Sequence, residues 1–231
     1  MTKPFVLSGT ILALTTVFAG SASAQESTPP FTAAEREAAY TQSIEKRATD
    51  ILQLLALNDA ARSAKVHSVI VAQYRALRAR DEAIDTMLKT LGKDAPGTET
   101  NRAAILPVLS RQLHDQFITK LSTDLTPEQV ERVKDKMTYH KVKVTYDAYC
   151  EIIPNLSEQE KARILAVLKE AREEGMDGGS ADEKSAIFQK YKNQINSYLN
   201  TNEHDVAKAT REWEAKQPKD DSAPTATRSP K

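Results

Sequence analysis

Apolar side chains recur at three- and four-residue steps along most of the chain after residue 31, which is the pattern of amphipathic helices. Ile44, Ala48, Ile51 and Leu55 keep this spacing, after a start signal at 32–35 in which a threonine precedes a glutamate by three positions. Further on, apolar residues repeat every seven positions, which favours a long helix in an antiparallel pair. The pattern predicts an all-α protein, an antiparallel helical bundle.

Start and stop signals divide the rest of the chain into shorter helices. Residues 92–100 predict a loop, because they combine glycine and proline with polar neighbours. Thr126 followed by Gln129 predicts one helix start, and Ser157 followed by Glu160 predicts another. A last long helix and a shorter one around the single tryptophan follow. We expect five to seven helices in all.

The run YHKVKVTYDAY, residues 139–149, interrupts the helical pattern. Polar and apolar residues alternate at its start, which predicts one short irregular or extended segment near 139–145. A short helix then resumes and stops before Pro154. Local departures from an otherwise consistent pattern are expected at functional sites. We therefore expect 139–149 to border a ligand surface together with the corner at 172–193.

The run EEGMDGGSADEK, residues 173–184, gathers three of the seven glycines among acidic residues. A calcium loop of the EF-hand kind needs oxygen ligands at its third and fifth positions, but counting from Asp177 these hold a glycine and an alanine. We therefore predict no metal site and a corner between two helices. In this corner Gly175 would end one helix, Gly178 and Gly179 would adopt positive φ, and a capping box would start the next helix.

The first 24 residues have the features of a secretory signal peptide: one cation at Lys3, an apolar run, and Ala22 and Ala24 before Gln25. The apolar run is too short to anchor the chain in a bilayer. We expect a periplasmic or secreted protein, with no membrane association after signal cleavage. The predicted divisions are a signal peptide at 1–24, an N-terminal extension at 25–31, a single helical domain at 32–216 and a disordered tail at 217–231.

The amino-acid composition excludes some classes of partner and of covalent link. The chain has 32 basic and 32 acidic residues, so no net basic field would attract a nucleic acid, and we expect no nucleic-acid partner. Cys150 is the only cysteine, which excludes a disulfide within the chain. We expect its thiol to be buried, with a reactive or dimer-linking thiol as the alternative.

Candidate chemistry is concentrated after residue 138, where most of the tyrosines lie among lysines. A tyrosine ring suits the face of a sugar, and a lysine suits the carboxylate of a uronic acid. Tyr139 and His140 are the candidate proton donors or acceptors. The four histidines show no spacing of a metal centre, and no motif of a known catalytic set is present. The sequence calls for no cofactor and leaves open whether the protein is an enzyme.

The stretch from residue 125 to residue 199 contains the runs LTPEQVE, VKD, MTY, VTY, EAREE and KYK. In these runs, and in RA and DI near residue 47, the chain resembles a domain-of-unknown-function family of exported bacterial helical proteins. Members are often encoded among genes for polysaccharide breakdown, which implies a carbohydrate-linked role. With the tyrosine and lysine pattern, the resemblance gives these candidate ligand-binding residues: Tyr139, Tyr146, Tyr149, Lys141, Arg172, Asp177 and Lys190.

Three functions remain open at this point. The first is an exported accessory protein of carbohydrate use that binds a saccharide or a partner protein. The second is a small lyase or hydrolase acting on an acidic sugar. The third is a chaperone, because LTPEQVERV and LSEQEKARI resemble the L-T-x-x-Q motif of periplasmic Spy-type helical chaperones, although two copies of one helix start signal also explain them.

Overall fold

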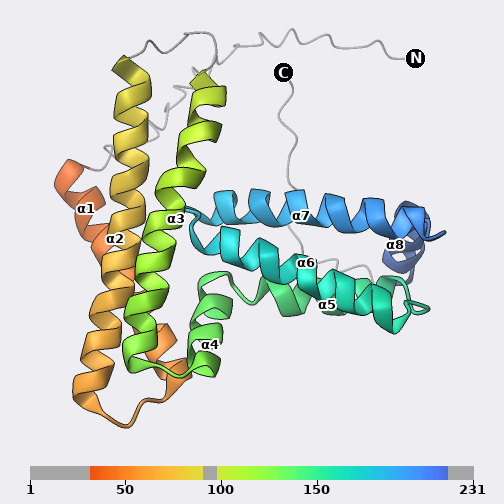
Figure 1. The fold of residues 1–231 in the computed structure, drawn as a ribbon, viewed down its shortest axis with the longest axis horizontal. Coiled ribbons are helices and arrows are strands. Elements are labelled where there is room, and N and C mark those ends of the chain that lie inside the picture. The colour runs from red at the N-terminus through yellow and green to blue at the C-terminus, as the bar shows by residue number, and fades with distance from the viewer. Residues whose placement is uncertain (1–31, 91–97, 218–231) are drawn as a thin grey trace, which may run out of the picture.

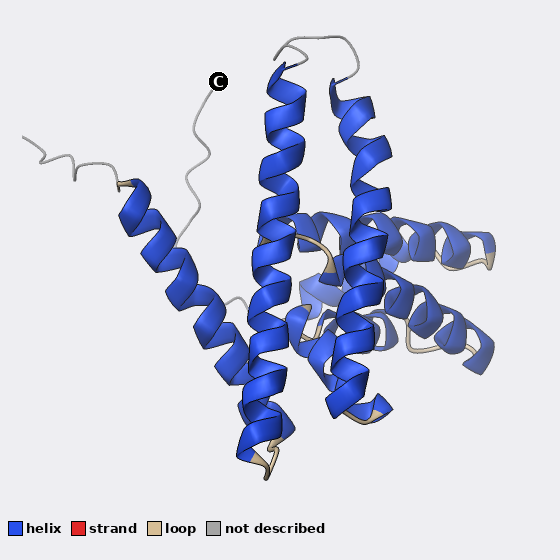
Figure 2. Cartoon of the chain, turned by 60° about the vertical axis from the view of Figure 1, so that its left-hand side comes forward, coloured by secondary structure: helices blue, strands red, loops and turns tan. Residues whose placement is uncertain are grey.

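The computed structural model describes residues 32–90 and 98–217, and every regular element within these ranges is a helix (Figure 2). The all-α prediction is confirmed, but the described residues form eight helices instead of the expected five to seven. The helices are α1 (Ala33–Leu55), α2 (Ala60–Thr90), α3 (Thr98–Asp124), α4 (Pro127–Met137), α5 (Lys141–Ile152), α6 (Glu158–Met176), α7 (Ala181–Thr201) and α8 (Val206–Lys216).

The helices form two groups that lie across each other (Figure 1). In the first group α1 packs on α2, and α2 pairs with α3. In the second group α6 pairs with α7, while α5 and α8 pack beside them. The short helix α4 contacts α1, α3 and α6, and so connects the groups. Antiparallel pairing is present within each group, but the two groups do not share one axis.

Each group has its own buried core. The first core is made of apolar side chains from α1 to α4, joined by Met176 at the end of α6. The second is made of apolar side chains from α5 to α8. The predicted stripe of α1 is fully buried from Ile44 to Leu55. Because burial of one large aliphatic side chain contributes about 1.5–3 kcal/mol, this stripe fixes the face that α1 turns toward its neighbours.

The predicted helix starts are present as hydrogen-bonded caps. Complete capping boxes begin α1 at Thr32, α4 at Thr126 and α6 at Ser157. Asp59 accepts a hydrogen bond of 3.0 Å from the backbone N–H of Arg62 at the start of α2. Each cap satisfies amides that have no partner within the helix, so these starts are decided by local sequence.

The expected short irregular or extended segment near 139–145 is confirmed only as an irregular turn at 139–140, because α5 begins at Lys141. Val142 and Tyr149, seven residues apart, are buried on the same face of α5, whereas Val144 is 64% exposed. The alternation of polar and apolar residues was therefore too short to decide between strand and helix. Only Tyr139 and His140 are irregular, and their backbone is left-handed, not extended.

The glycine-rich corner joins α6 to α7 as predicted, but its glycines act differently. Helix α6 continues through Gly175 to Met176, and none of the three glycines adopts a left-handed backbone. They permit close approach instead: a Cβ on Gly175 would lie 3.0 Å from the Phe188 ring, and a Cβ on Gly179 would overlap the Asp81 carboxylate. The glycines are needed for packing between elements, which the sequence does not display.

Several predictions fall on residues that the structure does not describe. These are the signal peptide at 1–24, the extension at 25–31, most of the loop at 92–100, and the tail after residue 217. Within the described ranges, no helix combines the length and the apolar character required to cross a membrane.

Candidate functional site

Arg172, a predicted ligand-binding residue, is buried where the two helix groups cross. Its side chain is 5% exposed, and it donates hydrogen bonds to Asp135 at 2.7 Å, to Glu173 at 3.1 Å and to Glu131. Burial opposes the guanidinium charge, but the hydrogen bonds to Asp135 and Glu131 outweigh it and raise the pKa of Arg172. Because three carboxylates already surround it, Arg172 ties α4 to α6 and its charge is compensated within the fold.

Asp177 is held by a histidine that the sequence did not single out. Nδ1 of His114, on α3, lies 3.3 Å from the Asp177 carboxylate, and its Nε2 lies 3.6 Å from Glu173. The hydrogen bond with Asp177 is the main reason that the pKa of His114 is raised. This pair joins α3 to the end of α6. The two residues are 63 positions apart, so no local pattern could have linked them.

Lys184 is the most deeply buried charged side chain of the described residues, at 1% exposure. Its Nζ donates to the backbone carbonyl oxygens of Gly175 at 2.9 Å and Met176 at 3.1 Å. These carbonyls belong to the last turn of α6, where partners within the helix are missing. Burial lowers the pKa of Lys184 to about 8. In the sequence this lysine resembles an ordinary surface charge in the first turn of α7.

The other candidates on α5 contribute to packing. The hydroxyl of Tyr149 donates a hydrogen bond of 2.6 Å to Asn196 Oδ1 on α7. Tyr146 packs against the second core, and Lys141 Nζ lies 6.0 Å from the centroid of the Phe188 ring. The fold therefore uses these three side chains to hold α5 against its neighbours.

Tyr139 and His140 line a pocket of about 270 Å³, which we call the Tyr139 pocket. It lies between α1, α2 and the turn from α4 to α5. Its lining residues are Arg47, Asp50, Ile51, Tyr74, Lys136, Met137, Tyr139 and His140. Five of them, at 47, 50, 51, 137 and 139, stand in the runs that carry the family resemblance. Residues from two distant parts of the chain thus meet in one pocket.

The backbone of this pocket is strained at two successive residues. Tyr139 has a φ of 57° and His140 a φ of 55°. A left-handed conformation costs a residue with a side chain about 1–2 kcal/mol. Backbone hydrogen bonds from Tyr139 to Lys136 at 3.1 Å and from His140 to Asp135 at 2.8 Å hold the turn. The result is an aromatic ring at the pocket that stays 45% exposed.

The charges of the Tyr139 pocket are predominantly basic. Its one carboxylate, Asp50, accepts hydrogen bonds of 2.8 and 3.0 Å from Lys46, and these are the main reason that the pKa of Asp50 is lowered. Arg47 lies over the Tyr74 ring at 5.5 Å. Within the described residues, neither Arg47 nor Lys136 has an ion-pair partner. Lys136 is one of the lysines that lie among the tyrosines in the sequence, whereas sequence reasoning missed Arg47 as a binding residue, although the RA run at residue 47 was a signal for it.

Asp177 and Lys190 line a different pocket of about 280 Å³, which we call the α3–α7 pocket. Its charged groups already have partners: Lys190 Nζ lies 3.0 Å from Glu174, the Asp177 carboxylate lies 3.3 Å from His114, and Glu183 accepts a hydrogen bond of 2.7 Å from Gly179 N–H. No residue lines both pockets. The predicted surface shared by residue 139, residue 140 and the corner at 172–193 is therefore not formed by a single pocket.

Cys150 is half-buried against the second core, not fully buried. In the described part of the chain, no group of three or more histidine, cysteine, aspartate or glutamate side chains is placed to hold a metal ion.

The large apolar side chains that are exposed do not gather in one place, so they give the chaperone hypothesis no support. They are distributed over α2, α3, α5 and the turn before α5: Met87, Val108, Leu109, Tyr139 and Val144.

The comparison with protein families agrees with the resemblance noted in the sequence. The family described as "Protein of unknown function (DUF3826)" matches residues 41–219. This range includes every residue that lines the Tyr139 pocket. No curated protein matches the chain.

Proposed function

Since the chain belongs to the DUF3826 family, whose description names no activity, we propose a function from the Tyr139 pocket: an exported accessory protein of carbohydrate use that binds an acidic saccharide. The observation that carries the proposal is the pair of strained residues, Tyr139 and His140, beside two cations without ion-pair partners. Strained backbone persists only where the surrounding structure enforces it, and it is concentrated at ligand-binding and active sites.

The side chains of the pocket complement the two features of a uronic acid unit. The exposed Tyr139 ring offers an apolar face for the sugar ring, with a hydroxyl at its edge for hydrogen bonds. Arg47 and Lys136 offer positive charge to the sugar carboxylate. A volume of about 270 Å³ is at the small end for ligand pockets, which fits one sugar unit of a longer chain.

A lyase or hydrolase acting on an acidic sugar is the second candidate. It is favoured by one observation, that Tyr139 and His140 line the same pocket as the two cations. In a lyase, the imidazole of His140 or the phenolate of Tyr139 would take the proton from the carbon beside the sugar carboxylate, whose developing charge the cations stabilise. The C–O bond on the next carbon would break as a C=C bond forms, and the leaving oxygen would take a proton from the other of the two groups. Arg172 and Lys190 have no part in this scheme, because both are paired with carboxylates of the chain.

A binding and turnover screen tests the proposal. The purified protein is titrated calorimetrically with uronate-containing oligosaccharides and with their neutral counterparts, and each mixture is assayed for products. We expect saturable binding of the acidic series, weakened about fivefold or more by Tyr139→Ala, since stacking on an aromatic ring contributes about 1 kcal/mol or more. Lys136→Gln should reduce the preference for acidic over neutral ligands, because Arg47 remains.

The matched control is Val144→Ala, which shortens an exposed apolar side chain five residues further on, outside the pocket. It should leave affinity unchanged. Products that disappear in Tyr139→Phe or His140→Ala, with binding retained, would favour the enzyme. If the folded protein binds no member of either series, the saccharide proposal is wrong.

A further inference from the structure

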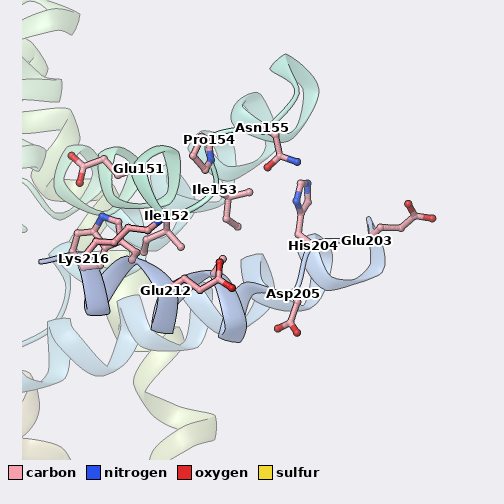
Figure 3. Close-up of a pocket in the computed structure, with 12 residues that line it drawn as sticks. Glu151, Ile152, Ile153, Pro154, Asn155, Glu203, His204, Asp205, Glu212 and Lys216 are labelled. Atoms are coloured by element: carbon pink, nitrogen blue, oxygen red, sulfur yellow. The ribbon is translucent and has the colours of Figure 1, made fainter.

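A third pocket, of about 390 Å³, lies between the end of α5 and α8 (Figure 3). It shares no lining residue with the other two pockets. Trp213, the only tryptophan of the chain, lines it, and we call it the Trp213 pocket. Ile152, Ile153 and Pro154 add apolar surface from the end of α5 and the turn after it, while Glu212 projects from α8 (Figure 3). The pocket thus combines apolar walls with charged groups.

Some polar groups of the Trp213 pocket hold the fold together. His204 Nε2 lies 2.9 Å from Glu160, which ties the turn before α8 to the start of α6. Asp205 caps α8 by accepting a hydrogen bond of 2.9 Å from the backbone N–H of Lys208. These two lining residues are therefore not available to a ligand.

The other carboxylates of the Trp213 pocket do not hold elements of the fold together. In the described part of the chain, Glu151 and Glu203 have no ion-pair partner, and Glu212 has only Lys208, at 3.9 Å. Lys216 is the one basic residue against these three. The α3–α7 pocket differs, because there Glu174 is paired with Lys190, Asp177 with His114, and Glu183 accepts a hydrogen bond from Gly179 N–H. The Trp213 pocket is therefore lined by more acidic than basic side chains, together with an aromatic ring.

We propose that the Trp213 pocket binds an organic cation, a ligand with an alkylated ammonium group. The face of an indole ring attracts such a cation more strongly than other aromatic side chains do, and nearby carboxylates strengthen the attraction. The apolar side chains of α5 suit the methyl groups that an alkylated ammonium carries. An anionic ligand would be repelled by the same carboxylates. This site is independent of the Tyr139 pocket, whose free charges are basic.

The single tryptophan makes the test specific to the site. Emission from Trp213 is recorded while the full chain is titrated with choline, and separately with 3,3-dimethylbutan-1-ol, which has the same shape without the charge. We expect a saturable change with choline and a response at least about tenfold weaker with the neutral alcohol. Added salt should weaken choline binding, because part of the attraction is between charges.

Two substitutions on α8 separate the pocket from general acidity. Glu212→Gln should weaken choline binding roughly threefold or more. Glu214→Gln removes the same charge from an exposed residue that does not line the pocket, and it should have no effect. Circular dichroism should be recorded to check that both variants are folded. If Glu212→Gln is not folded, Glu151→Gln is tested in its place.

Three results would overturn the proposal. Equal binding of choline and the neutral alcohol would show an apolar pocket without charge recognition. Equal losses in the Glu212 and Glu214 variants would show a non-specific effect of surface charge. Absence of any response to choline, by emission and by calorimetry, would show that no cation site exists.

Discussion

His114 and Lys184 lie at the crossing of the helix groups, and their pKa values are shifted in opposite directions. His114 is held by the charge of Asp177, so the folded protein favours its protonated form. Lys184 donates to backbone carbonyls, and burial disfavours its protonated form. The same region therefore raises the pKa of one base and lowers that of another, because a charged partner is close to the first and solvent is absent around the second.

The raised pKa of His114 predicts a pH-dependent contribution to stability. A group whose pKa is higher in the folded state stabilises the fold fully below its unfolded value, about 6.5, and loses this contribution as pH rises through the folded value. The free energy of unfolding of the wild type should therefore exceed that of His114→Gln by more at pH 5.5 than at pH 8.5. Urea titrations at the two pH values measure the difference. A gap that does not change with pH would contradict the role assigned to the Asp177 pair.

At the scale of elements, the corner between α6 and α7 depends on close approach. Gly175 lies inside the last turn of α6, where the Phe188 ring of α7 packs against its Cα. Alanine has the higher helix propensity, by about 1 kcal/mol, so a glycine here needs a tertiary reason. The reason is the 3.0 Å between a Cβ at this position and Cε2 of Phe188.

Gly175→Ala should therefore destabilise the protein by about 1–3 kcal/mol, in spite of the better propensity, because the buried Phe188 ring must move. Combined with Phe188→Leu, it should cost less than the sum of the two single substitutions. Urea unfolding of the wild type and the three variants measures this coupling. Additive losses, or a gain in stability from Gly175→Ala alone, would show that the approach of the Phe188 ring is not the reason for a glycine at position 175.

At the scale of the whole molecule, two cores have to be held in one arrangement. Met176 reaches from α6 into the first core, and Arg172 binds the carboxylates of α4 from the same helix. Helix α6 therefore belongs to the second group by its pairing with α7, and to the first by these two side chains. We infer that the contacts of Arg172 couple the unfolding of the two groups.

Arg172→Ala should lower the free energy of unfolding by about 1–3 kcal/mol, less than for a fully buried ion pair, because its three partners are 36–46% exposed and can be hydrated. It should also separate two signals that coincide in the wild type: Trp213 emission, which reports the second group, and helical circular dichroism, which reports both. Arg163→Ala, at an exposed position of the same helix, is the control and should change neither. Coincident transitions in Arg172→Ala would disprove the coupling.

The sequence by itself determined the helices and most of their starts. The stripe from Ile44 to Leu55 and the caps at Thr126 and Ser157 depend on residues within one or two turns, so their effect does not change with the rest of the fold. The sequence also singled out Tyr139 and His140, and both line one pocket. The predicted irregular or extended segment near 139–145 is correct only for the turn at 139–140, because five alternating residues do not outweigh the burial of Val142 and Tyr149 on one helix face.

Only the tertiary structure decided which side chains meet. Arg47 and Lys136 stand 89 positions apart in the sequence, yet they line one pocket because α4 packs on α1. The sequence predicted that three charged residues bind a ligand: Arg172, Asp177 and Lys190. In the structure, each of them is paired with a residue on another helix or an earlier turn. The physical reason is that a charge inside a fold is defined by its nearest partners, and those partners come from contacts between helices that are remote in sequence.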